Sequence, residues 1–256
     1  MTSSPPNRFR LVDYEAILEA AQAQGYTFAR FTDPAPSARA VYLRHDVDNS
    51  LESAVEMAEL EAQHDAVATY LVLVRSPNYN VFSGAGARAL RRLRELGHEV
   101  GLHFTAEEHD PSALAADLPA CIRGDAQLLE HVVSAPVRVF SFHNPAEKDD
   151  YAAEVPGLVN TYEDRFVVRY LSESNMSWRH GWPVEVLAEA QDPIVQILVH
   201  PFSYRADLTS DREVLLWFLR DKVTELLELN VAQNRVLREE ELGLEDVAAF
   251  LLERRA

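Results

Sequence analysis

Cysteine is almost absent from the 256-residue sequence: Cys121 is the only one, so an intrachain disulfide is excluded. Long hydrophobic runs are also missing, and no stretch approaches the roughly 18 apolar residues of a membrane-spanning helix. The N-terminal residues MTSSPPNRFRLVDYEAILEAAQ lack the continuous apolar segment of a signal peptide. We therefore expect a cytoplasmic protein without membrane insertion, although a chain trimmed of a leader would look the same.

Positive charge is scarce, with 24 Lys and Arg against 41 Asp and Glu and a formal net charge of −17. Such a surface repels phosphate backbones and anionic lipids, so nucleic acid and membrane surfaces are not expected partners. A neutral or cationic small substrate is easier to reconcile with it. Because the sequence has no internal repeat and no long Gly- or Ser-rich linker, we predict a single domain over residues 1–256.

Apolar stretches of strand length alternate with helical patterns along the chain. The strands are predicted at residues 40–45, 67–74, 99–104, 137–143, 158–162, 166–174 and 193–200. The helices are predicted at residues 14–25, 50–65, 86–97, 111–133, 183–191, 211–229 and 244–255. This alternation is typical of an α/β protein with a parallel sheet covered on both faces, and an open doubly wound sheet and a closed barrel both fit it.

Polar residues follow many of the predicted strands, and four of these strand ends carry a histidine. They are His45, Asp46 and Asp48; His103; His143 and Asn144; Glu173 and Ser174; and His200. Catalytic groups of α/β barrels collect at the carboxyl ends of the strands. The pattern therefore favours a barrel-like fold with one site.

The stretch VYLRHDVDNS, residues 41–50, contains two carboxylates spaced two residues apart. In an extended segment Asp46 and Asp48 point the same way, where like charges disfavour each other unless a cation lies between them. Ser50 is the expected N-cap of the following helix, and the other interpretation of the pair is that Asp48 or Asn49 caps that helix. Together with His103, His143 and His200, the pair predicts a His/Asp site for Zn²⁺ or another divalent transition metal.

Several further residues are weaker candidates. Glu107 and His109 follow His103 and could turn back toward the metal, or belong to a solvated acidic loop, whereas His98 after Gly97 is predicted to be structural. Aromatic and polar side chains near the strand ends could line a cleft and bind a sugar, or simply pack the loops. These candidates are Arg44, His45, Tyr79, Asn144, Trp178 and Arg179.

The motifs RHDVD, LGHEVGLHF and ILVHP resemble those of the polysaccharide deacetylase superfamily (the NodB-homology group, carbohydrate esterase family four), in a divergent bacterial branch. The resemblance covers about residues 41–204. It implies a distorted (β/α)7 barrel, to which helices at 11–26 and 210–256 are additions. It also implies one divalent metal ion, usually Zn²⁺, held by one Asp and two His.

By this resemblance Asp46 is the general base, Asp48 and His103 are metal ligands, and His200 is the general acid. The second histidine of the family's H-[ST]-x-x-H motif falls at Glu107. The third ligand is therefore open among His143, Glu107 and His109, with His143 favoured because it ends a strand. Since Val47 separates the two aspartates, their roles could be exchanged.

The implied activity is removal of an acetyl group from an N-acetylated sugar or polysaccharide precursor, with water activated by the metal. Two alternatives stay open: a metal hydrolase of another amide or ester, and a degenerate fold that binds a glycan without catalysis. The sequence makes no prediction of the oligomeric state.

Overall fold

The computed structural model describes residues 9–144, 152–204, 208, 210–236 and 242–253. The chain divides into two compact units, residues 1–207 and 208–256. The core predicted at residues 41–204 lies in the first unit, and the C-terminal helices predicted as additions to it lie in the second. Among the described residues, the clusters of buried apolar side chains draw on nothing beyond Tyr204.

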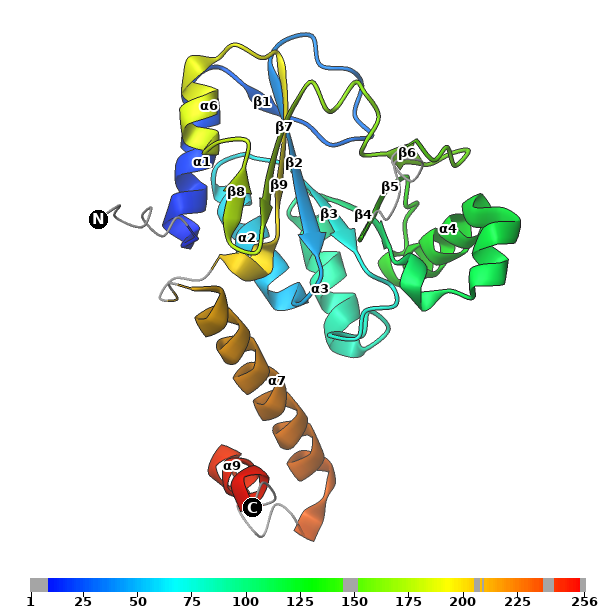
Figure 1. The fold of residues 1–256 in the computed structure, drawn as a ribbon, viewed down its shortest axis with the longest axis vertical. Helices are drawn as coiled ribbons and strands as arrows, with labels where there is room; N and C mark the ends of the chain where they lie inside the picture. The colour runs from blue at the N-terminus through cyan, green and yellow to red at the C-terminus, as the bar shows by residue number, and fades with distance from the viewer. Residues whose placement is uncertain (1–8, 145–151, 205–207, 209, 237–241, 254–256) are drawn as a thin grey trace. The chain divides into compact units, whose positions relative to one another are not determined.

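The first unit is built on one nine-stranded sheet (Figure 1). Its strand order is β6-β5-β4-β3-β2-β9-β7-β8, with β1 paired to the first residues of β2. All pairs are parallel except β7 with β8. The strands are β1 Thr27–Phe28, β2 Ala40–Val47, β3 Thr69–Val72, β4 Glu99–Phe104, β5 Val139–Phe142, β6 Val159–Asn160, β7 Arg169–Ser174, β8 Ser177–Arg179 and β9 Ile194–Val199.

Helices connect the strands and cover the curled sheet, which confirms the predicted barrel-like α/β fold. They are α1 Leu11–Ala23, α2 Leu51–Gln63, α3 Gly84–Glu95, α4 Pro111–Val133 and α6 Pro183–Glu189, with 3₁₀ turns η1 Ala106–Glu108 and η2 Pro201–Ser203. The second unit contains α7 Asp211–Gln233 and α9 Leu244–Glu253. None of the helices in the described ranges is long and apolar enough to cross a membrane.

Strand β2 lies inside the sheet, and all eight of its residues are buried. Burial on both faces explains why its sequence is a nearly continuous apolar run before the charged residues begin. Ser50 is the N-cap of α2, since its hydroxyl accepts a hydrogen bond from the backbone N–H of Ser53 at 3.1 Å. Ser50 rather than Asp48 or Asn49 thus caps α2, and the Asp48 side chain is available to the site.

Two short strands, β1 and β8, were not predicted from the sequence. Strands of two and three residues are too short to display a hydrophobic period, so only their pairing in the folded chain identifies them.

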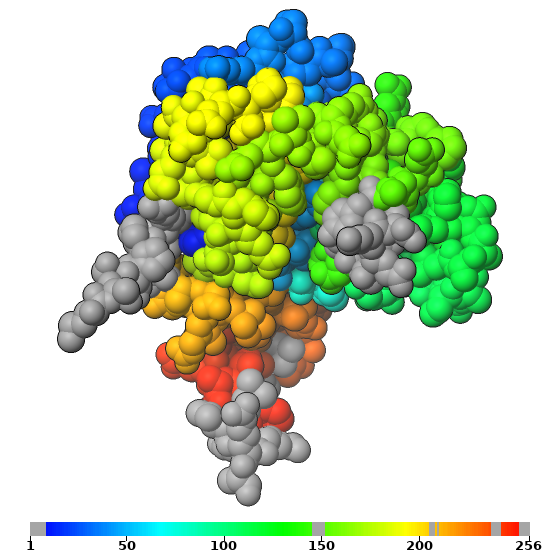
Figure 2. All heavy atoms as spheres, turned by 45° about the horizontal axis from the view of Figure 1, so that its top comes forward, coloured from blue at the N-terminus to red at the C-terminus, as the bar shows by residue number. Residues whose placement is uncertain are grey.

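Figure 2 shows the surface on one side of the fold, where atoms in the colours of the β2 and β3 region lie in a recess beside the yellow-green β7–β8 region.

Candidate active site

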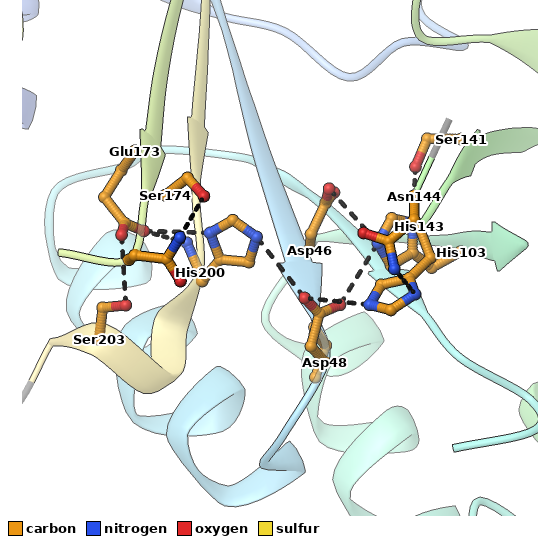
Figure 3. A network of polar contacts seen from close by, with 12 residues as sticks. Asp46, Asp48, His103, Ser141, His143, Asn144, Glu173, Ser174, His200 and Ser203 are labelled. Atoms are coloured by element: carbon orange, nitrogen blue, oxygen red, sulfur yellow. Dashed lines mark hydrogen bonds and ion pairs between the residues drawn. The ribbon is translucent and has the colours of Figure 1, made fainter. Parts of the chain in front are cut away.

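Five side chains meet at the carboxyl ends of β2, β4, β5 and β9 (Figure 3). Asp46 is the penultimate residue of β2 and Asp48 follows its final residue. His103 is the penultimate residue of β4, while His143 and His200 directly follow β5 and β9. The parallel order of the sheet brings these strand ends to one edge, as the sequence pattern predicts.

Asp48 lies at the centre of this group, and the three imidazoles turn their Nε2 atoms toward it (Figure 3). The Nε2 atom of His103 is 3.3 Å from Oδ1 of Asp48. The Nε2 atoms of His143 and His200 are 3.7 Å and 3.6 Å from Oδ2. Burial by itself would raise the pKa of Asp48, but the three imidazoles hold it well below its usual range. Asp48 is thus a carboxylate.

Each imidazole also has a polar neighbour at Nδ1. His103 forms a 2.8 Å hydrogen bond with the Ser141 hydroxyl, and the amide of Asn144 is 3.1 Å from Nδ1 of His143. His200 Nδ1 is 3.1 Å from a carboxylate oxygen of Glu173. A histidine whose outer nitrogen is held in this way presents the other nitrogen in a fixed direction, as metal-binding and catalytic histidines do.

Asp46 is held by Arg44, which lies two residues earlier on the same face of β2. Two hydrogen bonds of 2.9 and 2.8 Å join the guanidinium group to the two carboxylate oxygens, and both side chains are buried. The guanidinium carbon of Arg44 also lies over the ring of Tyr162, 4.6 Å from the centroid of that ring. Burial raises the pKa of Asp46, but the charge of Arg44, helped by His103, lowers it overall. Asp46 is therefore a fixed carboxylate 3.4 Å from Nε2 of His103.

His200 is coupled to Glu173, a fully buried residue of β7. Glu173 accepts hydrogen bonds from the backbone N–H of His200 at 3.1 Å and from that of Met176 at 2.8 Å. Burial opposes the imidazolium form of His200, but the hydrogen bond and charge of Glu173, with Asp48 and Asp46, raise its pKa to about 9. His200 therefore carries a proton at neutral pH and faces Asp48 with Nε2.

A metal ion would find suitable donor atoms here. Two atoms bound to a tetrahedral zinc at 2.0–2.1 Å lie about 3.4 Å apart. The separations from Asp48 to the three imidazoles, 3.3–3.7 Å, are close to this value. In addition, Oδ1 of Asp48 and Nε2 of His103 are buried and face each other at 3.3 Å without the geometry of a hydrogen bond. A cation held by both atoms would satisfy them together.

The complete coordination geometry is not formed. Within the residues that the structure describes, no group of three or more His, Cys, Asp or Glu side chains is arranged to hold a metal ion as it stands. The residue types and the pairwise distances therefore fit a metal, while the full set of ligands does not surround one position.

Of the three candidates for the third ligand, only His143 contacts Asp48 in the described structure. Glu107 lies on the exposed turn η1 and accepts a 3.4 Å hydrogen bond from Asn144. His109 turns toward α4, where it contacts the buried Asp125 at 2.8 Å. Asp125 is also bound by Arg75 at 3.1 Å, so His109 belongs to a separate ion-pair cluster.

His45 was a weak candidate for substrate binding, and the structure places it on the opposite face of β2. Neighbouring residues of a strand point to opposite sides, so His45 points away from Asp46. Its Nε2 atom is 2.6 Å from Glu61 of α2, in a buried cluster with Tyr14 and Tyr70. His98 joins the same region and bridges the backbone of Ala68 and Ala58, so its interpretation as a structural residue agrees with its contacts.

The aromatic candidates have structural contacts of their own. The Tyr79 hydroxyl donates to the carbonyl of Val47 at 2.5 Å and accepts from the N–H of Leu73 at 2.9 Å. Trp178 of β8 packs edge to face against Trp182, with centroids 5.7 Å apart. Arg179 is exposed at the end of β8. Tyr79 is therefore fixed to the loops around β2, and Trp178 and Arg179 lie on the hairpin beside Glu173.

Two residues that contact the histidines of the site, Ser141 and Glu173, were not predicted from the sequence as site residues. Glu173 was noted only as a polar strand end, and Ser141 was not singled out. Glu173 faces His200 because β7 pairs with β9, a neighbour relationship that the order of the strands along the chain does not reveal. Ser141 could have been found from its position, since it precedes His143 by two residues and is paired with His103 in the sheet.

No protein-family model and no curated protein matches the sequence. Solved structures with a similar fold include a mutant, with restored enzymatic activity, of BA3943, a CE4 family pseudoenzyme from Bacillus anthracis. Identity is 16%, the match covers 76% of this chain and 68% of the other, and the TM-score is 0.44.

Two further similar structures are described as deacetylases. The Streptococcus pyogenes deacetylase PplD in complex with acetate is 12% identical, with 84% of this chain and 89% of the other covered and a TM-score of 0.43. The polysaccharide deacetylase Bc1974 from Bacillus cereus is 18% identical, with 72% and 88% covered and a TM-score of 0.40. Identities and TM-scores this low give no information on activity. The activity has to be inferred from the side chains of this chain.

Proposed function

We propose that the chain is a metal-dependent hydrolase that removes an acetyl group from an N-acetylated sugar or polysaccharide precursor. The observation that supports this proposal most is the convergence of His103, His143 and His200 on Asp48, beside a second carboxylate that is fixed by a buried arginine. A metal ion between these side chains would also satisfy Oδ1 of Asp48 and Nε2 of His103, which are buried and face each other without the geometry of a hydrogen bond.

In this proposal Asp48, His103 and His143 hold one divalent ion, with Zn²⁺ the best match to an Asp/His donor set. When bound, such an ion supplies Lewis acidity, which polarises an amide carbonyl and makes water more acidic. His143 is the assigned third ligand because it is the only one of the three candidates with a described contact to Asp48.

The other side chains move protons. Asp46 accepts a proton from the attacking water as the water oxygen bonds to the acetyl carbon; Arg44 keeps this carboxylate in place. His200 donates its Nε2 proton to the sugar nitrogen as the C–N bond breaks, so acetate and a free amine leave. Glu173 fixes the ring of His200 through its Nδ1 atom and stabilises the charged form of the imidazole. The strongly acidic chain is compatible with the cationic amine product.

A second candidate function is binding of a glycan without catalysis. It is favoured by the finding that no set of three side chains in the described ranges is already arranged around a metal position. It would make the buried Arg44–Asp46 pair a purely structural ion pair.

An activity comparison separates the two functions. The wild-type protein, incubated with zinc, is assayed for acetate release from N-acetylglucosamine oligomers, next to Asp46→Asn and Asp125→Asn. Asp125 is a matched control because it is also a buried carboxylate bound by arginine, and it contacts Arg75 and His109 instead of the histidines around Asp48. We expect activity in the wild type and in Asp125→Asn, and a loss of about 10²–10⁴-fold in Asp46→Asn. Sugar binding without acetate release in all three proteins would contradict the hydrolase and favour the binding protein.

A further inference from the structure

Helix α7 of the second unit exposes an unusual amount of apolar surface. Twelve large apolar side chains are exposed in the described part of the chain, and half of them lie on this one helix. These six aliphatic side chains are 36–59% exposed, and they are Leu215, Leu216, Leu219, Val223, Leu226 and Leu229. Such a concentration is typical of a surface that packs against another apolar surface.

The exposed residues form one stripe along the helix. Leu216, Leu219, Val223 and Leu226 follow one another at intervals of three, four and three residues, which are the a and d positions of a heptad. Leu215 and Leu229 occupy the adjoining g position, so the stripe has the width of a helix-bundle face. From Leu215 to Leu229 it extends about 21 Å along the axis. The next a position is Asn230, a single polar residue of the kind that fixes the register between paired helices.

We propose that α7 packs along this stripe against α7 of a second copy of this chain, forming a two-fold symmetric dimer. A heptad seam is self-complementary, because its a and d side chains fit the spaces between the same residues of an identical helix. An anionic membrane surface does not suit the helix, which carries five carboxylates and only three basic side chains.

The composition of the second unit also calls for a partner. Its described residues contribute nothing to the hydrophobic core clusters, and within α7 only Val214 and Phe218 are buried. A helical unit of about 50 residues without a core of its own is usually stabilised by association. Pairing of two α7 stripes would give the second units of the two copies a shared apolar core.

The area of the stripe agrees with a dimer interface. A fully accessible aliphatic side chain presents roughly 100 Å² of apolar surface, so six half-exposed ones offer about 300 Å² per chain and about 600 Å² per pair. Standard interfaces bury about 1,200–2,000 Å², of which somewhat more than half is non-polar. The stripe therefore supplies most of the non-polar area of a small but stable interface, with the polar flanks of α7 as its rim.

The proposal is tested by the mass of the full chain in solution. Light scattering after gel filtration is measured over a range of concentrations for the wild type, Leu219→Glu and Leu128→Glu. Leu128 of α4 is a matched control because it is an exposed leucine, at 42%, on a helix of the first unit. Leu219 is 48% exposed, so glutamate is compatible with the folded single chain, which circular dichroism verifies.

We expect the wild type and Leu128→Glu to have twice the chain mass of 28.9 kDa. Leu219→Glu should dissociate at least about 10²-fold more readily, since each dimer would bury two unpaired carboxylates. A wild type that stays at the mass of one chain at the highest concentration would overturn the proposal. So would a Leu219→Glu protein that dimerises as tightly as the control.

Discussion

The buried cluster behind β2 leads to a prediction about stability that does not depend on the identity of the substrate. Glu61 of α2 is fully buried and accepts hydrogen bonds from Tyr14 at 2.5 Å and Tyr70 at 2.7 Å. His45 of β2 lies 2.6 Å from the same carboxylate. Burial alone would raise the pKa of Glu61, but His45, helped by His98 and the Tyr14 hydroxyl, lowers it overall, so Glu61 is ionised. This cluster ties the strand that carries Asp46 to helix α2.

Substitution of Glu61 by Gln keeps the size of the side chain and removes its charge. Three charge-assisted hydrogen bonds then become neutral ones, at a loss of about 0.5–1.5 kcal/mol each, so we expect the free energy of unfolding to fall by about 2–4 kcal/mol at pH 7. Glu59→Gln is the control, because Glu59 lies on the same helix in an exposed ion pair with Arg92. Its free energy of unfolding should change by no more than about 0.5–1 kcal/mol.

The two variants are compared by urea unfolding at pH 7 and at lower pH. A carboxylate whose pKa is lowered by folding stabilises the protein above its unfolded pKa of about 4.3, and this contribution disappears as the pH falls through the folded pKa. The difference between wild type and Glu61→Gln should therefore shrink below about pH 4.3. A Glu61→Gln protein as stable as Glu59→Gln at pH 7, or a difference that grows on acidification, would refute this reasoning.

Three other changes have defined expectations. Glu173→Gln should lower kcat for acetate release by about 10²–10⁴-fold, measured at saturating substrate, because the acid histidine loses the charge that orients it. Arg44→Met should lower the free energy of urea unfolding by about 3–5 kcal/mol, since it leaves Asp46 buried without its arginine; the double change Arg44→Met with Asp46→Leu should recover most of this loss. Gly101→Ala should cost about 1–3 kcal/mol in the same assay, because the added Cβ would lie 2.5 Å from a side-chain carbon of Val139.

Much of the site was predictable because strands impose simple rules on their side chains. The spacing of Asp46 and Asp48 places both carboxylates on one face of β2, and histidines that follow apolar strands collect at one edge of a parallel sheet. The same period of two could have placed Arg44 next to Asp46 and His45 on the opposite face. Neither placement was derived from the sequence.

The remaining features depend on contacts that are distant in the sequence. Glu173 reaches His200 only because β7 lies beside β9, and His109 is directed elsewhere by Asp125 of α4. The division of the chain after residue 207 was also hidden, because the apolar residues of α7 do not state what they pack against. Local patterns identify the elements, whereas pairing between elements needs the folded chain.

The most direct test of the site is the metal content of the protein, purified without chelator or nickel resin and measured by elemental analysis. Three proteins are compared: the wild type, His103→Ala and His109→Ala. We predict about one zinc or other transition-metal ion per chain in the wild type and in His109→Ala, and a large loss in His103→Ala. A wild type that retains no metal after incubation with zinc and dialysis, or a His103→Ala protein that binds as much as the wild type, would contradict the metal site centred on Asp48.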